Sequence, residues 1–272
     1  MRELDIDVGS CRLHLRESGS GFPILLGHSL SFDSHMWEAQ RRALEDRYRV
    51  IAVDLRGHGA TEWTPGDVTL GDLADDLARL LDQLGLERAA YAGLSLGGMV
   101  GMRFALRHPE RVAALALLNT SAEPEDPTTQ KMYHQSNESS RTAASGSPGG
   151  EAMAHFMMSL MFSDGFVADN PEEVAPYRAR LLEPTDREGL YRVAKAVIWR
   201  EGILDDLSRL TMPSVVITSS ADRAIAPARG KALAQALDTE LIEIEGAGHM
   251  TAVERPAEVN AVLEQLLERG TA

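Results

Sequence analysis

Residues 89–100, AAYAGLSLGGMV, decide the fold of this chain. The run from Ala89 to Ala92 is short and apolar, which predicts a buried strand. Residues 93–97 then match the pattern G-x-S-x-G, and apolar residues at helical spacing follow as far as His108-Pro109, a helix-stop signal. A strand, a sharp turn with Ser95 at its tip and a helix together form the local structure that a nucleophilic serine requires.

The glycines around Ser95 have a physical explanation. A sharp turn strains the serine backbone, and side chains two positions before and after it would collide with the strand and the helix. Gly93 and Gly97 lack such side chains, and Gly98 allows the helix to pack close to the sheet. The backbone N–H of Leu96 then lies at a helix N-terminus, where it can stabilise negative charge. Because the bare pattern also fits a glycine-rich turn with an idle serine, the partners of Ser95 decide between the two interpretations.

Length and composition limit the classes of protein to consider. A chain of 272 residues can hold one α/β domain with an insertion, or at most two small domains. Its apolar content of 44% and charged content of 25% are ordinary for a soluble globular protein. The net charge of −14 argues against nucleic acid or an anionic membrane surface as a partner. We therefore expect a small-molecule ligand, and the sequence leaves open whether the chain forms a homo-oligomer.

Cysteine usage and targeting signals indicate the compartment. The single cysteine, Cys11, cannot form an intrachain disulfide, so nothing requires an oxidising environment. The N-terminus has no signal-peptide core, and no stretch approaches the length of a membrane span. We expect a cytoplasmic protein of bacterial type. Because the sequence has no H-E-x-x-H, paired C-x-x-C or G-x-x-x-x-G-K-[ST] motif, no metal and no cofactor are expected.

Strand-like and helix-like segments alternate along most of the chain, which predicts an α/β fold with a mostly parallel sheet. Continuous apolar runs indicate strands buried on both faces at 23–27, 50–54, 112–118 and 214–218. Further strands are expected at the N-terminal hairpin, 3–8 with 11–17, and at 240–244. Helical patterns lie at about 38–44, 70–84, 228–236 and 256–267.

The alternation stops after the strand at 112–118. Residues 134–150 are rich in Ser, Thr, Asn and Gly and contain no strand-like run, whereas helices are predicted at about 151–162 and 171–204. We therefore predict a helical cap inserted between two strands of one sheet and covering the site. The predicted division is a core of 1–121 with 211–272 and a cap of 122–210.

A base that activates Ser95 should lie on a loop at the carboxyl edge of the same sheet. His249 follows the last predicted strand in the glycine-rich loop 245–250, from which an imidazole can reach across. We interpret His58 as a structural residue of its own loop and His28 as support for the loop that it begins. The histidines interpreted as surface or packing residues are His14, His108, His134 and His155.

An acid that orients this histidine should follow the penultimate strand, because triads built on such a serine turn run in the chain order Ser, Asp or Glu, His. Asp222 stands there, although a helix cap or a partner for Arg223 would also explain it. Glu123, which follows the strand at 112–118, is the rival acid. Glu254 lies near His249 in sequence, and we interpret it as a charge at the N-terminus of the closing helix.

Backbone N–H groups and apolar side chains complete the predicted site. Leu96 and Leu30, the latter in the loop after the strand at 23–27, are expected to donate to the oxyanion, each such donor being worth about 10²–10³ in rate. The predicted pocket walls are Ile225, Met250, Met157 and Trp199. Apolar residues at helical spacing also form the cores of caps, but a methionine-rich cap suits a medium-sized, largely apolar acyl or alcohol group.

Taken together, these residues resemble the α/β-hydrolase family over essentially the full length. The N-terminal half resembles 3-oxoadipate enol-lactonases and small bacterial carboxylesterases, on the segments GHSL at 27–30, HMW at 35–37, DLRGHGA at 54–60, GLSLGG at 93–98 and LNT at 118–120. The resemblance implies hydrolysis of an ester or lactone by a triad of Ser95, Asp222 and His249. It also implies that Leu30 supplies the second oxyanion N–H.

Two departures from the family, one at residues 28–29 and one in the inserted segment, leave the substrate open. Many relatives have His-Gly where this chain has His28-Ser29, enol-lactonases usually have Asn at position 28, and the segment 122–204 does not match the lactonase cap. Two other reactions, carbon–carbon bond hydrolysis and perhydrolysis, could use the same triad. A further alternative is a non-catalytic binding module with the same fold. A haloalkane dehalogenase is disfavoured, since it needs a carboxylate where Ser95 stands.

Overall fold

The computed structural model describes residues 1–63, 65–142, 147–182 and 186–271. An eight-stranded sheet runs through this part of the chain in the order β1-β2-β4-β3-β5-β6-β7-β8. β2 pairs antiparallel with β1 and with β4, and all the other neighbours pair in parallel. The α/β fold predicted above is therefore confirmed. The strands are Arg2–Asp7 (β1), Arg12–Ser18 (β2), Phe22–Gly27 (β3), Tyr48–Asp54 (β4), Ala89–Leu94 (β5), Val112–Leu118 (β6), Ser214–Ser219 (β7) and Glu240–Ile244 (β8).

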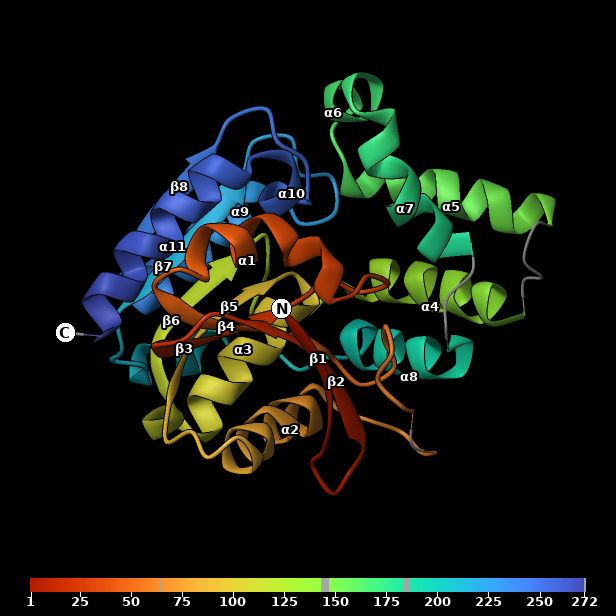
Figure 1. Cartoon of the computed structure of the whole chain (residues 1–272). Coiled ribbons are helices and arrows are strands. Elements are labelled where there is room, and N and C mark those ends of the chain that lie inside the picture. The colour runs from red at the N-terminus through yellow and green to blue at the C-terminus, as the bar shows by residue number, and fades with distance from the viewer. Residues whose placement is uncertain (64, 143–146, 183–185, 272) are drawn as a thin grey trace.

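Helices cover both faces of the sheet (Figure 1). In β3, Ile24 and Leu26 contribute to the core on one face, while Leu25 contributes to the core on the other. Because both faces are buried, neither needs polar residues, which explains the continuous apolar runs. Helices α1 (Glu38–Leu44) and α11 (Pro256–Thr271) lie on the first face, and α2 (Leu70–Gln83), α3 (Leu96–Arg107) and α9 (Pro227–Leu237) lie on the second.

The segment between β6 and β7 is helical and lies together at one side of the sheet (Figure 1). We refer to its helices as the cap: α4 (Pro127–Thr142), α5 (Pro148–Met161), α6 (Asp164–Asp169), α7 (Pro171–Leu182) and α8 (Arg187–Ile198). The sequence did not predict α4. The inward face of this helix is polar, so it shows no apolar residues at helical spacing. The predicted helix at 171–204 is instead α7 and α8, followed by the 3-10 turn Leu204–Arg209.

Short helical turns complete the described elements: Ser34–Trp37, Pro109–Arg111 and Thr251–Glu254, the last labelled α10. Among the helices of the described ranges, none combines the length and apolar composition needed to cross a membrane.

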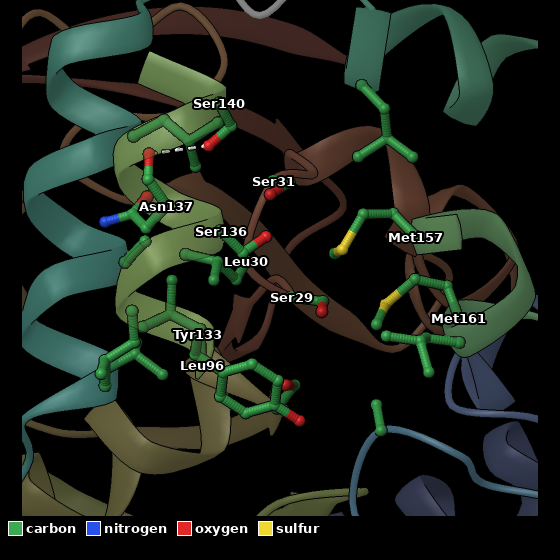
Figure 2. A pocket seen from close by; sticks show the side chains of 18 of the residues that line it. Ser29, Leu30, Ser31, Leu96, Tyr133, Ser136, Asn137, Ser140, Met157 and Met161 are labelled. Atoms are coloured by element: carbon green, nitrogen blue, oxygen red, sulfur yellow. Dashed lines mark hydrogen bonds between the residues drawn. The ribbon is translucent and has the colours of Figure 1, made fainter. Parts of the chain in front are cut away.

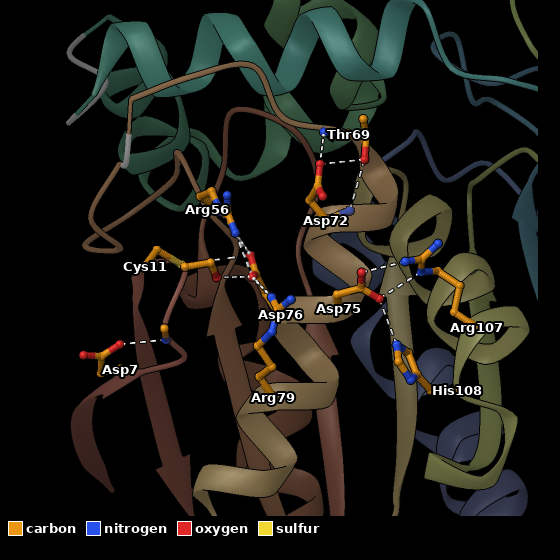
Figure 3. Close-up of polar contacts among 12 residues, drawn as sticks. Asp7, Cys11, Arg56, Thr69, Asp72, Asp75, Asp76, Arg79, Arg107 and His108 are labelled. Atoms are coloured by element: carbon orange, nitrogen blue, oxygen red, sulfur yellow. Dashed lines mark hydrogen bonds and ion pairs between the residues drawn. The ribbon is translucent and has the colours of Figure 1, made fainter.

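A buried ion pair fixes α2 against the loop that follows β4 (Figure 3). Asp76 on α2 is 2% exposed and accepts hydrogen bonds from Arg56, with an Nη2 to Oδ2 distance of 2.6 Å. The Ser10 hydroxyl donates to the same carboxylate at 2.5 Å.

Burial raises the pKa of the neighbouring Cys11 thiol to about 11, with the charge of Asp76 acting in the same direction. The thiol is therefore protonated and unreactive at neutral pH.

Candidate active site

The turn between β5 and α3 holds Ser95 in a strained backbone conformation. Its φ of 54° and ψ of −111° lie in a region that L-residues rarely adopt, so the surroundings must enforce it. The Ser95 N–H donates to the Leu118 carbonyl at 2.9 Å, and the Thr120 hydroxyl donates to the Ser95 carbonyl at 2.7 Å. A Cβ atom on Gly93 would overlap the backbone of Gly97, which is the collision expected from the sequence.

Ser95 and His249 line the same cavity, which has a volume of about 250 Å³. Ser95 follows β5 and His249 lies in the loop after β8, so the parallel strands bring the two residues to one edge of the sheet. The cap helices α4, α5 and α8 contribute the opposite walls. The cavity thus lies between the carboxyl edge of the sheet and the cap.

His249 and Asp222 form a buried pair. Nδ1 of His249 lies 2.9 Å from Oδ2 of Asp222, and both side chains are at most 1% exposed. The other oxygen, Oδ1, accepts backbone N–H groups of Ala224 at 2.8 Å and Ile225 at 2.9 Å. Burial alone would raise the pKa of the Asp222 carboxyl, but the charge and hydrogen bond of His249 and these other donors hold it below its ordinary value. Asp222 is therefore an anion that fixes the orientation of the imidazole.

Asn119 is a residue of this site whose role was not predictable from the motifs above. Its Nδ2 donates to Asp222 Oδ2 at 2.9 Å and to the Ser219 hydroxyl at 2.7 Å. Its Oδ1 accepts from the Thr251 hydroxyl at 2.7 Å. The Asn119 side chain thus joins the loops that follow β6, β7 and β8. A polar residue directly after a buried apolar strand was the signal that could have identified it.

Leu30 and Leu96 place backbone N–H groups beside the cavity that both residues line. Leu96 is the first residue of α3, and the first N–H groups of a helix have no partner within the helix. In the part of the chain that the structure describes, no hydrogen-bond acceptor is found for either N–H. Both are therefore available to a negatively charged oxygen.

His28 and His58 have structural environments. His28 is fully buried, with Nδ1 2.8 Å from the Ser29 carbonyl and Nε2 accepting the Leu55 N–H at 2.9 Å. Burial lowers the pKa of His28, and burial beside His28 lowers the pKa of His58 to about 3. Both imidazoles are thus neutral at neutral pH. His28 supports the loop that carries Leu30, in agreement with its interpretation from sequence.

Of the four predicted wall residues, the structure places two at the cavity. Ile225 and Met157 line it. Met250 does not, because its side chain is fully buried in the core. Trp199 does not either: it is 48% exposed and its ring lies 5.9 Å from that of His134 on the cap. The prediction for Met250 and Trp199 was therefore wrong, since spacing along the chain does not show which way a side chain points.

The two other acids have different surroundings. The carbonyl of Glu123 accepts the Arg200 Nε at 2.9 Å, and Glu123 does not line the cavity. Glu254 is 4% exposed and accepts hydrogen bonds from the Ser163 N–H at 3.1 Å and the Ser163 hydroxyl at 2.5 Å. Its interpretation as a charge at the start of the closing helix was wrong, because its carboxylate is occupied by the cap.

Among the described residues, we find no group of three or more His, Cys, Asp or Glu side chains that could hold a metal ion.

Comparison with known proteins defines the class. The sequence profile of the α/β hydrolase fold matches residues 23–256, and the chain therefore belongs to this family. It is 28% identical to 3-oxoadipate enol-lactonase 2 of Acinetobacter baylyi over 246 residues, which cover 90% of this chain and 88% of that protein.

Solved structures agree with this assignment. A thermophilic esterase from Thermogutta terrifontis, in a malate-bound structure, superimposes with a TM-score of 0.91 at 29% identity and covers 100% of both chains. The enol-lactonase from Burkholderia xenovorans superimposes with a TM-score of 0.86 at 29% identity, over 97% of this chain and 100% of that one.

Proposed function

We propose that this protein hydrolyses carboxylic esters or lactones through an acyl-enzyme formed on Ser95. The observation that carries the proposal is the buried pair of His249 and Asp222, whose imidazole lines the same cavity as the strained serine. The strained turn holds the Ser95 hydroxyl at the edge of the sheet. The pair of His249 and Asp222 supplies an oriented base. The enol-lactonase and esterase relatives support ester and lactone carbonyls as the target.

The proposed mechanism has two halves. Ser95 Oγ attacks the carbonyl carbon while His249 accepts the hydroxyl proton, and the carbonyl oxygen becomes an anion that the Leu30 and Leu96 N–H groups stabilise. The tetrahedral intermediate collapses, and His249 returns the proton to the leaving alkoxide. Water then attacks the acyl-enzyme with His249 again as base, which releases the carboxylic acid and regenerates Ser95. In a lactone, acid and alcohol leave as one hydroxy acid.

A Ser95→Ala variant tests the proposal directly. We expect kcat for p-nitrophenyl acetate and butyrate to fall by about 10⁴-fold or more, since loss of a triad serine costs about 10⁶ where it has been dissected. The matched control is Ser159→Ala, which makes the same change at a half-buried position of α5 that does not line the cavity. We also expect a fluorophosphonate to add one covalent group to Ser95, identified by peptide mass spectrometry.

Near-wild-type activity of Ser95→Ala, or no labelling of Ser95, would contradict the proposal and favour a non-catalytic binding protein. Product analysis with matched esters, lactones and β-diketones, with and without hydrogen peroxide, separates ester hydrolysis from carbon–carbon bond cleavage and perhydrolysis. We expect carboxylic acids from esters and lactones and no turnover of the diketones.

A further inference from the structure

Two of the cap helices that wall the cavity, α5 and α4, differ in chemistry (Figure 2). Helix α5 supplies an apolar wall that includes Met153, Met157, Leu160 and Met161. Helix α4, facing Met157 and Met161 across the cavity, supplies the side chains that we call the polar wall: Tyr133, Ser136, Asn137 and Ser140.

The polar wall follows helical geometry. Positions 133, 136, 137 and 140 are separated by steps of three, one and three residues, which places them on one face of α4. On a helix that packs over an interior, this face usually carries apolar residues. Polar groups turned inward are costly unless they have hydrogen-bond partners. A polar face over a cavity therefore points to a polar ligand.

Protein partners leave part of this hydrogen-bonding capacity unused. Within the described ranges, no hydrogen bond is found for the Tyr133 hydroxyl, and the Ser136 hydroxyl meets only the sulfur of Met153 at 3.7 Å. Asn137 Nδ2 donates to the Tyr191 carbonyl at 3.0 Å, and no donor reaches its Oδ1 in the same ranges. A ligand in the cavity can therefore exchange hydrogen bonds with two hydroxyls and one amide oxygen.

Two arginines that line the cavity near the polar wall, Arg141 and Arg200, are already paired with carboxylates. Arg141 donates to Glu188 at 2.8 Å and lies over the ring of Tyr191, 4.6 Å from its centroid. Arg200, whose side chain is 1% exposed, donates to Glu125 at 2.7 Å, and Glu125 also accepts from Arg229 at 2.8 Å. Because these guanidinium groups have carboxylate partners, the wall offers neutral hydrogen-bonding groups more than free charge.

We infer that the preferred substrate has an aliphatic arm on one side of its ester or lactone group, against α5. The other arm carries a neutral hydrogen-bonding group, a hydroxyl, ether or amide, and lies against the polar wall. This inference rests on the proposed function and specifies its substrate class. It adds Tyr133 and Ser136 as residues that determine specificity.

Isosteric ester pairs test the inference. On the acyl side, p-nitrophenyl pentanoate is compared with p-nitrophenyl 3-methoxypropanoate; on the alcohol side, butyl acetate is compared with 2-methoxyethyl acetate. In each pair an ether oxygen replaces one methylene. The readout is the ratio of kcat/KM for the ether over the alkyl ester, with each value divided by the rate of hydroxide-catalysed hydrolysis.

The variant that removes both free hydroxyls is Tyr133→Phe with Ser136→Ala. One neutral hydrogen bond is worth about 2- to 10-fold, so we expect the ether-to-alkyl ratio to fall by about 10-fold in one of the two pairs. The matched control is Ser139→Ala, an equal change on the exposed face of α4. We expect it to keep the wild-type ratio, because Ser139 does not line the cavity.

A second measurement reads the cavity without turnover. N-butylacetamide and N-(2-methoxyethyl)acetamide are titrated against the Ser95→Ala protein by NMR, again with and without the two α4 substitutions. If the ether preference is unchanged by the substitutions in both assays, the inference is wrong and the proposed function stands. If no ester is hydrolysed but the amides still discriminate, the proposed function fails and the polar wall stands. A third outcome would also overturn the inference. If p-nitrophenyl hemisuccinate is hydrolysed with a higher kcat/KM than both p-nitrophenyl pentanoate and p-nitrophenyl 3-methoxypropanoate, the cavity binds an anionic group and not a neutral one.

Discussion

Asn119 Nδ2 and His249 Nδ1 each lie 2.9 Å from the same oxygen of Asp222, Oδ2. With two backbone N–H groups on Oδ1, the carboxylate has four hydrogen-bond partners and one orientation. Asn119 itself has a φ of 45°, in the left-handed region that Asn tolerates better than most residues. One residue therefore provides both the backbone conformation at the end of β6 and the amide that positions the Asp222 carboxylate.

Replacing Asn119 with glycine removes the amide while keeping a backbone that accepts positive φ. We expect kcat/KM to fall by about 10- to 100-fold, since a hydrogen bond to a charged group contributes about 1.5–3 kcal/mol. The loss of a donor also raises the pKa of Asp222, because that donor favours the ionised form. The protonated fraction of Asp222 then grows as the pH falls, so the ratio of variant to wild-type kcat/KM should be smaller at pH 5 than at pH 8.

A structural role alone would lower activity equally at all pH values. A variant-to-wild-type ratio that stays constant between pH 8 and pH 5 would therefore reduce Asn119 to a packing residue. The comparison variant is Ser219→Ala, which removes another partner of the Asn119 amide but no contact with the carboxylate. It should cost less activity and leave the pH profile unchanged.

His58 should make folding stability depend on pH. Burial and the nearby His28 lower its folded-state pKa to about 3, against about 6.5 for an unfolded chain. Between these values the unfolded state binds more protons, so this contribution is complete above pH 6.5 and is lost as the pH falls toward 3. At pH 5 the loss amounts to about 2 kcal/mol, from 1.36 kcal/mol per pH unit.

Urea denaturation of the wild type and His58→Gln at pH 7.5 and pH 5 measures this term. We expect the variant to lose about 2 kcal/mol less stability than the wild type on acidification. His155→Gln, at an exposed position of α5, is the control and should follow the wild type. Equal acid sensitivity of wild type and His58→Gln would contradict the burial argument.

The fold was predictable because its signals are local. The sharp turn around Ser95 needs glycines at fixed positions, and strands buried on both faces need unbroken apolar runs such as 112–118. The chain order along a parallel sheet then brings Asp222 and His249 to the edge where Ser95 lies. These inferences need only backbone geometry and the order of strands.

The parts that the sequence did not yield depend on side-chain direction. Met157 lies on α5 and Trp199 directly follows α8, but only Met157 lines the cavity. Helix α4 was missed because its inner face is polar, so the usual apolar period does not mark it. Glu254 is four residues before the exposed Glu258 on the same short stretch of chain, yet it is buried against Ser163. Tertiary contacts, absent from any local pattern, decide each case.

Asp76 should contribute more to stability than its sequence neighbour Asp75. Asp76 is buried with Arg56, whereas Asp75 pairs with Arg107, whose side chain is 53% exposed (Figure 3). Asp76→Ala leaves the Arg56 charge buried without a partner, and we expect a loss of about 3–5 kcal/mol. Asp75→Ala removes a partly solvated pair and should cost about 1 kcal/mol or less. Urea denaturation checks both, and equal losses would contradict the assigned difference in burial.

Glu254 should couple the cap to the loop that carries His249. Its carboxylate accepts both the backbone N–H and the hydroxyl of Ser163 at the end of α5, and the Met250 N–H donates to the Met161 carbonyl at 2.9 Å beside it. Glu254→Ala leaves two buried donors without an acceptor, each costing about 1–3 kcal/mol. We therefore expect a loss of about 2–6 kcal/mol in urea denaturation.

The same variant should change specificity, since a loosened cap weakens contacts with the acyl chain more than contacts with the reacting carbonyl. We expect kcat/KM for p-nitrophenyl pentanoate to fall more than that for the acetate, whose acyl group is too short to span the cavity. Ser163→Ala is the intermediate case, because the Ser163 N–H can still donate to Glu254 while the hydroxyl is gone. Equal losses on both esters would mean that Glu254 stabilises the fold without holding the cap against the substrate.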